Sequence, residues 1–424
     1  MGMKKDAESG QHAGAGRATA ARAASVAAAA KPIVEAALRL LREHRALDLS
    51  MREIAVAAGV APSLVAYHFE SRPHVVACAC AVAGAHWRQK LGELTAAAAA
   101  EAGAARKAEV CSAWMAGLAA DRPDLARLWG DLLLAAAREP LLAAVALDWV
   151  AAWRETWLAI AEGNQEAAAI AGEFAAFEMV FTAPLLGIVD RDLIMREAMR
   201  RVFLRIEGGK VSTIDCYWHT RFCLDRMDPL PAKAAPDRAV KARIIDAAAD
   251  IIAIEGASAA THRAIAARAG ASLSSMTYHF ETRAMLVREG LLRVFQRSMT
   301  SRPLEQADVA AWDEVADAQF ERSTRAPDGA PGERLSMVRA IAEVAQEAAI
   351  DPGFRDVAME LRRIRGLVTR QSIAHALGLS DVAGAAAADY AIWESGAALL
   401  RDVESCGHEA GRADSVAHAM RVFF

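Results

Sequence analysis

Two clusters of hydroxyl, aromatic and basic side chains occur at matching positions in this sequence. One ends in Tyr67-His68-Phe69 and the other in Tyr278-His279-Phe280, an offset of 211 residues. Hydroxyl, phenol, imidazole and guanidinium groups near one short helix can bind phosphate oxygens and base edges, so the chemistry indicated is nucleic-acid binding. The candidate contact residues are Ser50, Ser63, Leu64, Tyr67, His68 and Arg72 in the first cluster, and Thr261, Ser274, Ser275, Thr277, Tyr278, His279 and Arg283 in the second.

Each cluster lies in a stretch that has the pattern of two short helices joined by a tight turn. In the second copy Thr261 is a suitable N-cap, and Gly270 ends the first helix where a positive φ is needed. Ser50 and Gly59 take the same positions in the first copy. A new helix begins three to four residues after each glycine. The pattern predicts a helix-turn-helix, whose second helix lies in the DNA major groove.

The two copies agree over a longer stretch at the same offset, which indicates a duplicated domain. The matched pairs include Ile33 with Ile244, Arg52 with Arg263, Gly59 with Gly270, Ser63 with Ser274, and Arg72 with Arg283. The repeated unit resembles the DNA-binding domain of the tetracycline-repressor-like (TetR) regulators in four features. These are an apolar first helix, a Ser/Thr-capped second helix, Ala-Gly at the turn, and an aromatic-His-Phe ending followed by a basic residue. The resemblance implies that this basic residue and the Tyr/His pair hold the DNA backbone.

Length and composition favour an all-α fold with several domains. A chain of 424 residues is too long for one compact domain, alanine is abundant, and alternating β-branched stretches are hard to find. We expect two tandem units, each a three-helix helix-turn-helix DNA-binding domain followed by a helical ligand-binding and dimerisation domain. The expected parts are a mobile basic arm (1–30), a DNA-binding domain (31–91), a helical domain (92–206), a linker (207–236), a second DNA-binding domain (237–299) and a second helical domain (300–424). Periodicity places the last helices near 283–301, 308–323, 333–349, 353–377, 380–402 and 409–424.

The distribution of charge supports this division. A net charge of −4 taken alone argues against a nucleic-acid-binding protein. Residues 31–91, however, hold 8 basic and 5 acidic side chains, and residues 237–299 hold 9 and 6, so each segment is +3 and the remainder is −10. Two basic modules on an acidic body are expected of domains that contact DNA.

The cysteines and apolar runs indicate where the protein works. The six cysteines lack disulfide-like spacing, and no signal-peptide pattern is found near the N-terminus, so we expect reducing cytoplasm. With the expected DNA binding, this means association with the nucleoid. Apolar runs such as 141–147 end well before the ~20 residues needed to span a bilayer, so we expect no membrane span. Cys216, His219 and Cys223 could offer three ligands to zinc, but a fourth is missing, so we predict no metal and no cofactor.

The first helical domain contains the residues that could line a ligand pocket. Trp149, Trp153 and Trp157 recur every four residues on one helix face, and Glu178 lies on the following helix. Pockets are often lined by aromatic side chains with a few polar groups, although a tryptophan stripe is more often plain core. No catalytic motif that would place a nucleophile beside a base is found, so we predict no catalytic residue and no enzyme.

The two copies differ in the number of hydrogen-bond donors that they offer. Leu64 stands where the second copy has Ser275, and Ala66 stands where it has Thr277. We call the helix-turn-helix domains at 31–91 and 237–299 the first and second heads. The second head is therefore expected to bind DNA more strongly, while the first either reads a more apolar half-site or is a structural relic.

The resemblance implies a regulator that binds double-stranded operator DNA, most often a repressor that an unidentified small molecule releases. The main alternative is a ligand-sensing or protein-interaction module with degenerate heads. An all-α enzyme is an alternative that the sequence favours much less. Family members dimerise through their last two helices, here about 165–206 and 380–424. Because a linker raises the effective concentration of the two halves, we expect an intramolecular pseudo-dimer, with a homodimer as the alternative.

Overall fold

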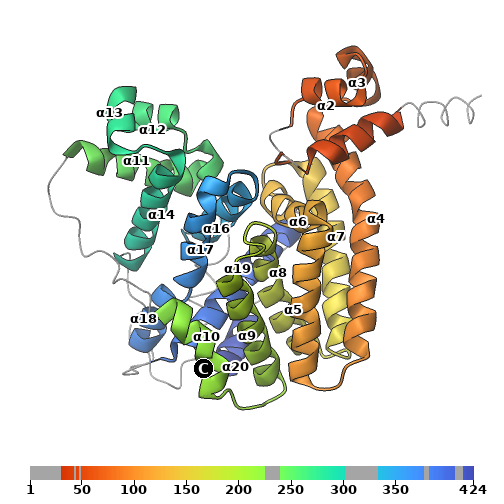
Figure 1. The fold of residues 1–424 in the computed structure, drawn as a ribbon, viewed down its shortest axis with the longest axis vertical. Helices are drawn as coiled ribbons and strands as arrows, with labels where there is room; N and C mark the ends of the chain where they lie inside the picture. The colour runs from red at the N-terminus through yellow and green to blue at the C-terminus, as the bar shows by residue number, and fades with distance from the viewer. Residues whose placement is uncertain are drawn as a thin grey trace, which may run out of the picture. The chain divides into compact units, whose positions relative to one another are not determined.

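The computed structural model describes residues 30–42, 44–46, 49–224, 239–300, 333–376, 382–405 and 414–424. These residues are almost entirely helical and contain no strand, which confirms the all-α fold (Figure 1). The predicted arm, apart from Ala30, and the predicted helix at 308–323 lie outside the described residues. Internal contacts divide the chain into two compact units, Met1–Ala85 and His86–Phe424.

The first unit is a small three-helix domain that continues into a long helix. A helix over residues 30–40 is followed by α2 (Met51–Ala58), α3 (Pro62–His68) and the start of α4 (Arg72–Ala99). Apolar side chains at helical spacing from all four helices are excluded from water, which is the main force that holds so small a domain together. The buried residues are Ile33, Ala36, Ala37, Leu41, Leu49, Ile54, Ala55, Val65, Phe69, Val75 and Val76.

The second unit begins with the first helical domain. It comprises the end of α4 followed by α5 (Ala104–Asp121), α6 (Pro123–Ala135), α7 (Pro140–Ile160), α8 (Gln165–Thr182) and α9 (Val189–Ile206). Pro123 and Pro140 each occupy a first helical turn, where the missing N–H costs nothing. Asn164 caps α8 by accepting a hydrogen bond from the Ala167 N–H at 3.1 Å.

The same unit also holds the second predicted head and the second helical domain. The head comprises α11 (Ala239–Glu255), the 3₁₀ turn η3 (Ala257–Ala259), α12 (His262–Ala269), α13 (Leu273–His279) and α14 (Arg283–Thr300). The second helical domain comprises α16 (Glu333–Ile350), η4 (Pro352–Phe354), α17 (Arg355–Arg363), α18 (Leu367–Ala376), α19 (Gly384–Ser405) and α20 (Asp414–Phe423).

The prediction of one continuous helix over residues 353–377 is wrong. The chain is interrupted at Gly366, which has a φ of 92° and lies against α19. A Cβ at this position would collide with the backbone of Ala388, so the site requires glycine for both its backbone conformation and its close contact.

Part of the expected linker is folded onto α9. Residues 213–224 form η1 (Thr213–Cys216), α10 (Tyr217–His219) and a π-helical turn, η2 (Thr220–Leu224). Glu197 of α9 accepts hydrogen bonds from the backbone N–H groups of Trp218 and His219, both at 2.8 Å. Burial lowers the pKa of His219 to about 4, so this imidazole is neutral at physiological pH. Residues 213–224 of the expected linker are therefore part of the first helical domain. Residues 225–236 lie outside the described residues.

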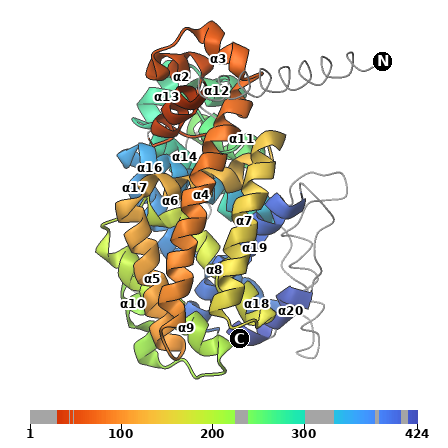
Figure 2. The same ribbon diagram turned by 90° about the vertical axis from the view of Figure 1, so that its right-hand side faces the viewer.

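The two halves pack against each other through their last helices. Helix α19 crosses α8, and Figure 2 shows α7, α8 and α19 side by side. At the crossing, Gly396 touches the backbone of α8 so closely that a Cβ would collide with the Glu173 carbonyl. Helix α20 contacts α9, so the predicted helix pairs do meet within one chain, but α16 of the second half also packs on α6 and α8 of the first.

Buried ion pairs accompany this contact. Arg201 of α9 donates two hydrogen bonds to the Asp389 carboxylate of α19, at 2.6 and 2.8 Å, and Arg205 adds a third at 2.7 Å. Burial alone would raise the pKa of Asp389, but attraction to the two arginines outweighs it, so the pKa is lowered. Glu178 of α8 likewise pairs with Arg362 of α17. Removing one partner from such a pair leaves a buried charge uncompensated, which is strongly destabilising.

Replacing glycine by alanine should have opposite effects on stability at Gly396, which lies in the close crossing, and at Gly117, which does not. Gly396→Ala forces α8 and α19 apart and should lower the free energy of unfolding by about 3 kcal/mol. Gly117→Ala, on α5, meets open space and should raise it by up to about 1 kcal/mol, because alanine is the better helix former. Urea unfolding followed by circular dichroism compares the two variants. Equal effects would contradict the close crossing.

Candidate nucleic-acid interface and effector pocket

The two heads share one local geometry. Helices α2, α3 and α4 begin at residues 51, 62 and 72, and α12, α13 and α14 begin 211 residues later at 262, 273 and 283. The turn glycines are left-handed in both copies, with φ of 67° at Gly59 and 60° at Gly270. Ser50 caps α2 in a capping box with Glu53, and Thr261 caps α12 by accepting from the Ala264 N–H at 3.1 Å. The structure therefore has a helix-turn-helix at each predicted position.

The second helix of each motif presents one face to solvent. Val65 of α3 and Met276 of α13 are buried and fix the helix on its domain. Ser272 caps α13 by accepting from the Ser275 N–H at 3.1 Å, whereas Ala61 gives α3 no side-chain cap. Predicted contact residues on the solvent side of the two motifs are Ser50, Ser63, Leu64 and Tyr67 in the first head, and Thr261, Ser274, Thr277 and Tyr278 in the second.

The tyrosines are the most exposed large side chains of these helices. Tyr67 is 72% exposed and Tyr278 is 82% exposed. Each ring makes an edge contact with the half-buried histidine that follows it, at 5.2 Å for His68 and 5.1 Å for His279. Large aromatic groups held open to water at equivalent positions of two domains are typical of residues that meet a partner.

The hydroxyl groups of α13 are partly used within the helix. Thr277 donates to the carbonyls of Leu273 and Ser274 at 3.2 and 3.1 Å, so its oxygen is left as an acceptor. Ser274 shares a hydrogen bond of 2.9 Å with Ser272, and Ser275 is half-buried. Ser274 and Tyr278 are therefore the better placed donors of this set.

Arg283 is used inside the molecule. Its guanidinium donates to the carbonyls of Ala257 and Ala260 at 2.8 and 3.3 Å and pairs with Glu347 of α16 at 2.7 Å. It also lies over the ring of Phe354, 5.3 Å from its centroid. These contacts join the second head to the second helical domain, and the expected phosphate contact would have to compete with all of them. Its counterpart Arg72 is half-buried.

A second acidic residue of α16 holds the same loop of the head. Glu343, one helical turn before Glu347, is buried and accepts a hydrogen bond from the Ala257 N–H. Its carboxylate fills the place of a Cβ on Gly256, whose φ is 93°, so this residue must be glycine. Arg138, between α6 and α7 of the first helical domain, pairs with the same carboxylate. The second head is therefore attached to both helical domains.

These contacts and two exposed arginines were not predicted from the sequence. Arg52 and Arg263 lie in the first turns of α2 and α12, exposed and without an ion pair among the described residues. Their equivalence was visible in the repeat, and an exposed basic residue at a helix start could have been marked as a phosphate contact. Arg138 and Glu343 are 205 residues apart, and no local signal links them.

The tryptophan stripe is mainly packing core. Trp87 stacks on Trp129, Trp149 and Trp153, with ring centroids 5.0–5.8 Å apart. Trp153 also donates to the Gly172 carbonyl at 2.9 Å. Trp157 alone among the three predicted residues lines the pocket described next. Glu178 is not in its lining, because its carboxylate is buried against Arg362.

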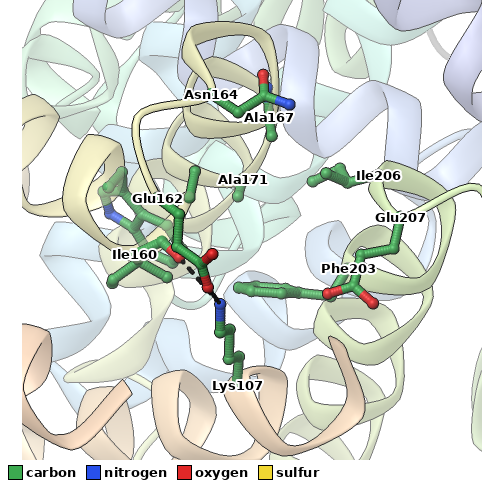
Figure 3. A pocket seen from close by; sticks show the side chains of 11 residues that line it. Lys107, Ile160, Glu162, Asn164, Ala167, Ala171, Phe203, Ile206 and Glu207 are labelled. Carbon is green, nitrogen blue, oxygen red and sulfur yellow. Dashed lines mark hydrogen bonds and ion pairs between the residues drawn. The ribbon is translucent and has the colours of Figure 1, made fainter. Parts of the chain in front are cut away.

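A pocket of about 340 Å³ opens between α5, α7, α8 and α9. Figure 3 shows Lys107, Glu162 and Phe203 pointing toward one another at its wall. The Lys107 ammonium is 2.5 Å from the Glu162 carboxylate. The lining consists of Lys107, Trp157, Ile160, Ala161, Glu162, Asn164, Ala167, Ala171, Phe203, Ile206 and Glu207. Its volume lies within the range that binds small molecules.

Other kinds of site receive no support from the described residues. No group of three or more His, Cys, Asp or Glu in them could hold a metal ion, and Cys216, His219 and Cys223 are included in that search. No helix in the described part of the chain is both long and apolar enough to cross a membrane.

Comparison with known families identifies the two heads. Residues 33–77 and 244–289 both match the family model for bacterial regulatory proteins of the tetR family. The chain therefore carries two tetR-family domains in tandem, the DNA-binding domains of transcriptional regulators, which points to a regulator rather than an enzyme. Comparison with curated proteins finds no significant match.

The contacts of Arg283 predict a structural effect of its removal. Arg283→Met breaks three hydrogen bonds to the head loop and α16 and should lower the free energy of unfolding by about 2 kcal/mol. Arg268→Met, in the same head, removes one exposed ion pair with Glu255 and should cost at most about 0.5 kcal/mol. Urea unfolding measures both. A loss for Arg283→Met no larger than for Arg268→Met would show that Arg283 does not attach the head.

Proposed function

We propose that the protein is a sequence-specific repressor that binds double-stranded operator DNA with both heads and is released by a small molecule. The observation that carries this proposal is the pair of solvent-facing recognition helices, α3 and α13, in one repeated geometry with Tyr67 and Tyr278 exposed. A short helix held by a buried apolar residue and open on its other face suits insertion into the major groove.

The start of the next helix supplies a phosphate site beside each recognition helix. Ser71 and Thr282 accept hydrogen bonds from the N–H groups of His74 and Met285, at 3.4 and 3.2 Å, and so cap α4 and α14. In α14 the N–H groups of Arg283 and Ala284 remain for an anion, which the helix dipole favours, whereas in α4 only that of Arg72 remains, because Pro73 has no N–H. Arg52 and Arg263 add exposed positive charge to the same heads. Phosphate binding there would set the register of α3 and α13 on the duplex.

The two heads should read unlike half-sites. The solvent face of α3 offers Ser63, Leu64 and Ala66, whereas that of α13 offers Ser274 and Thr277. Apolar groups suit thymine methyls, and hydroxyls suit base-edge donors and acceptors. An operator read by both heads would therefore be an imperfect palindrome, with half-sites one helical turn or a multiple apart.

One chain should supply both heads. The buried Arg201 depends on Asp389 of the other half, and Glu178 depends on Arg362, so each half carries charges that the other neutralises. Pairing two copies of the same half would leave these charges without such partners unless others replaced them. We propose that the chain is a monomer in solution and internally a pseudo-dimer, with a homodimer as the alternative.

Release by a ligand would act through the attachment of the second head. Arg138 and Glu343 connect the first helical domain to the loop before α12. A ligand that binds one arrangement of the helical domains better than another shifts the equilibrium toward that arrangement, to an extent set by the difference in affinity. The position of the second head would change with it. The second candidate function is a ligand sensor without DNA binding, and the exposed Tyr67 and Tyr278 argue against it.

Single tyrosine variants test the DNA-binding proposal. Selection from a random library supplies the duplex, which should be an imperfect palindrome. Tyr278→Ala should weaken binding tenfold to a hundredfold, or about 1.4–2.8 kcal/mol, and Tyr67→Ala should weaken it less because the first head offers fewer donors. Fluorescence anisotropy at fixed salt measures both.

Tyr217→Ala is the matched control, because Tyr217 is exposed but lies outside the heads. It should leave DNA affinity unchanged. Equal losses for Tyr67→Ala and Tyr278→Ala would refute the ranking of the heads. Absence of any salt-dependent DNA binding would favour the sensor function.

A further inference from the structure

The pocket between α5, α7, α8 and α9 combines an apolar wall with one half-buried charge. Trp157, Ile160, Ala167, Ala171, Phe203 and Ile206 form the wall. A volume of about 340 Å³ holds on the order of ten water molecules, so a compact organic molecule fits. The apolar wall would bind the hydrocarbon part of such a molecule, and the charged group would fix its orientation.

This charge is the half-buried ammonium of Lys107. Its side chain is 12% exposed, and its partners among the described residues are the Glu162 carboxylate at 2.5 Å and the Ile160 carbonyl at 3.4 Å. Glu162 is 79% exposed. A cation with little access to water is stabilised by a nearby anion, whereas an exposed carboxylate can return to water at little cost. Lys107 therefore stays at the wall, while Glu162 can be replaced.

The turn that carries Glu162 is held independently of Lys107. Glu162 has a φ of 55°, the left-handed conformation, and no other non-glycine residue in the described segments has a positive φ. Non-glycine residues seldom adopt this region, and those that do are held there by their surroundings. Backbone hydrogen bonds at the end of α7, such as that from the Gly163 N–H to the Leu158 carbonyl at 2.9 Å, hold this turn, so the Glu162 side chain can leave Lys107 while the turn stays in place.

Exposure decides the sign of the ligand's charge. The lining has two carboxylates, Glu162 and Glu207, against one ammonium, which by count favours a cation. Both glutamates are exposed, however, and water screens their charges. Lys107 is the charge in the less polar surroundings, where an ion pair with a ligand is screened least. Trp157 adds a buried indole N–H that has no acceptor among the described residues.

We propose that this pocket binds an amphipathic organic anion, whose carboxylate pairs with Lys107 in place of Glu162 and whose apolar part lies against Trp157, Ile160 and Phe203. Glu162 acts as an internal substitute for the ligand's carboxylate. The ligand displaces it and keeps the charge of Lys107 neutralised.

Helix α7 connects this pocket to the attachment of the second head, and this step rests on the proposed function. Ile160, in the pocket wall, is the last residue of α7, and Arg138 lies two residues before its first. A helix of 21 residues spans about 30 Å as one stiff element. Displacement of α7 at the pocket would therefore reach the contact between Arg138 and Glu343.

Calorimetry with three compounds that share one tail tests the assignment. The compounds are 4-phenylbutyrate, 4-phenylbutanol and 4-phenylbutylamine, titrated into the full chain. The carboxylate should bind at least about tenfold more tightly than the alcohol or the amine, because only it pairs with Lys107. Lys107→Met should remove this advantage and leave binding of the alcohol unchanged.

Two further variants test the roles of Lys107 and Glu162 separately. Lys90→Met removes a lysine that pairs with Glu93 outside the pocket and should change no affinity. Glu162→Gln removes the internal competitor and should tighten binding of 4-phenylbutyrate severalfold, provided that its thermal unfolding matches the wild type. Tightest binding of the amine, an unchanged affinity in Lys107→Met, or no binding of any compound at millimolar concentration would overturn the proposal. DNA binding is measured separately, so a protein that binds 4-phenylbutyrate through Lys107 but no DNA would refute only the proposed function.

Discussion

The buried ion pair between Arg201 and Asp389 determines how the helical domains of this chain fit together. Both side chains are excluded from solvent, and the guanidinium donates to both carboxylate oxygens. Such a pair is tolerated only where each charge finds its partner in good geometry, which constrains α9 against α19. The crossing of α8 and α19 at Gly396 adds a constraint of shape, because only glycine allows the two backbones so close.

The attachment of the second head follows from this packing. Because the halves are held together, Arg138 of the first helical domain and Glu343 of the second meet at one loop of that head. Arg283 donates to a carbonyl of the same loop and pairs with Glu347 of α16. The first head belongs to a compact unit of its own. The duplication has therefore produced two heads of equal local geometry whose surroundings differ.

The sequence predicts well what depends on neighbouring residues. Caps at Ser50 and Thr261 and left-handed turns at Gly59 and Gly270 involve contacts within a few residues, and all four are confirmed. Contacts between distant segments were not predictable. Gly366 interrupts the expected helix where α19 lies against it. Arg283 turns inward to pair with Glu347, which is 64 residues away in the sequence and so could not be foreseen from local pattern. Periodicity correctly placed the three tryptophans on one face of a helix. It could not show whether that face packs in the core or lines a ligand pocket.

The central claim is that one chain supplies both heads to one operator through pairing of its own halves. Light scattering of the protein with its selected duplex, at micromolar concentration, tests this directly. The account predicts a free protein of 45.2 kDa and a complex that contains one chain for each duplex. A free species of twice that mass, or a saturated complex with two chains on one duplex, would show that pairing occurs between chains and would contradict the account.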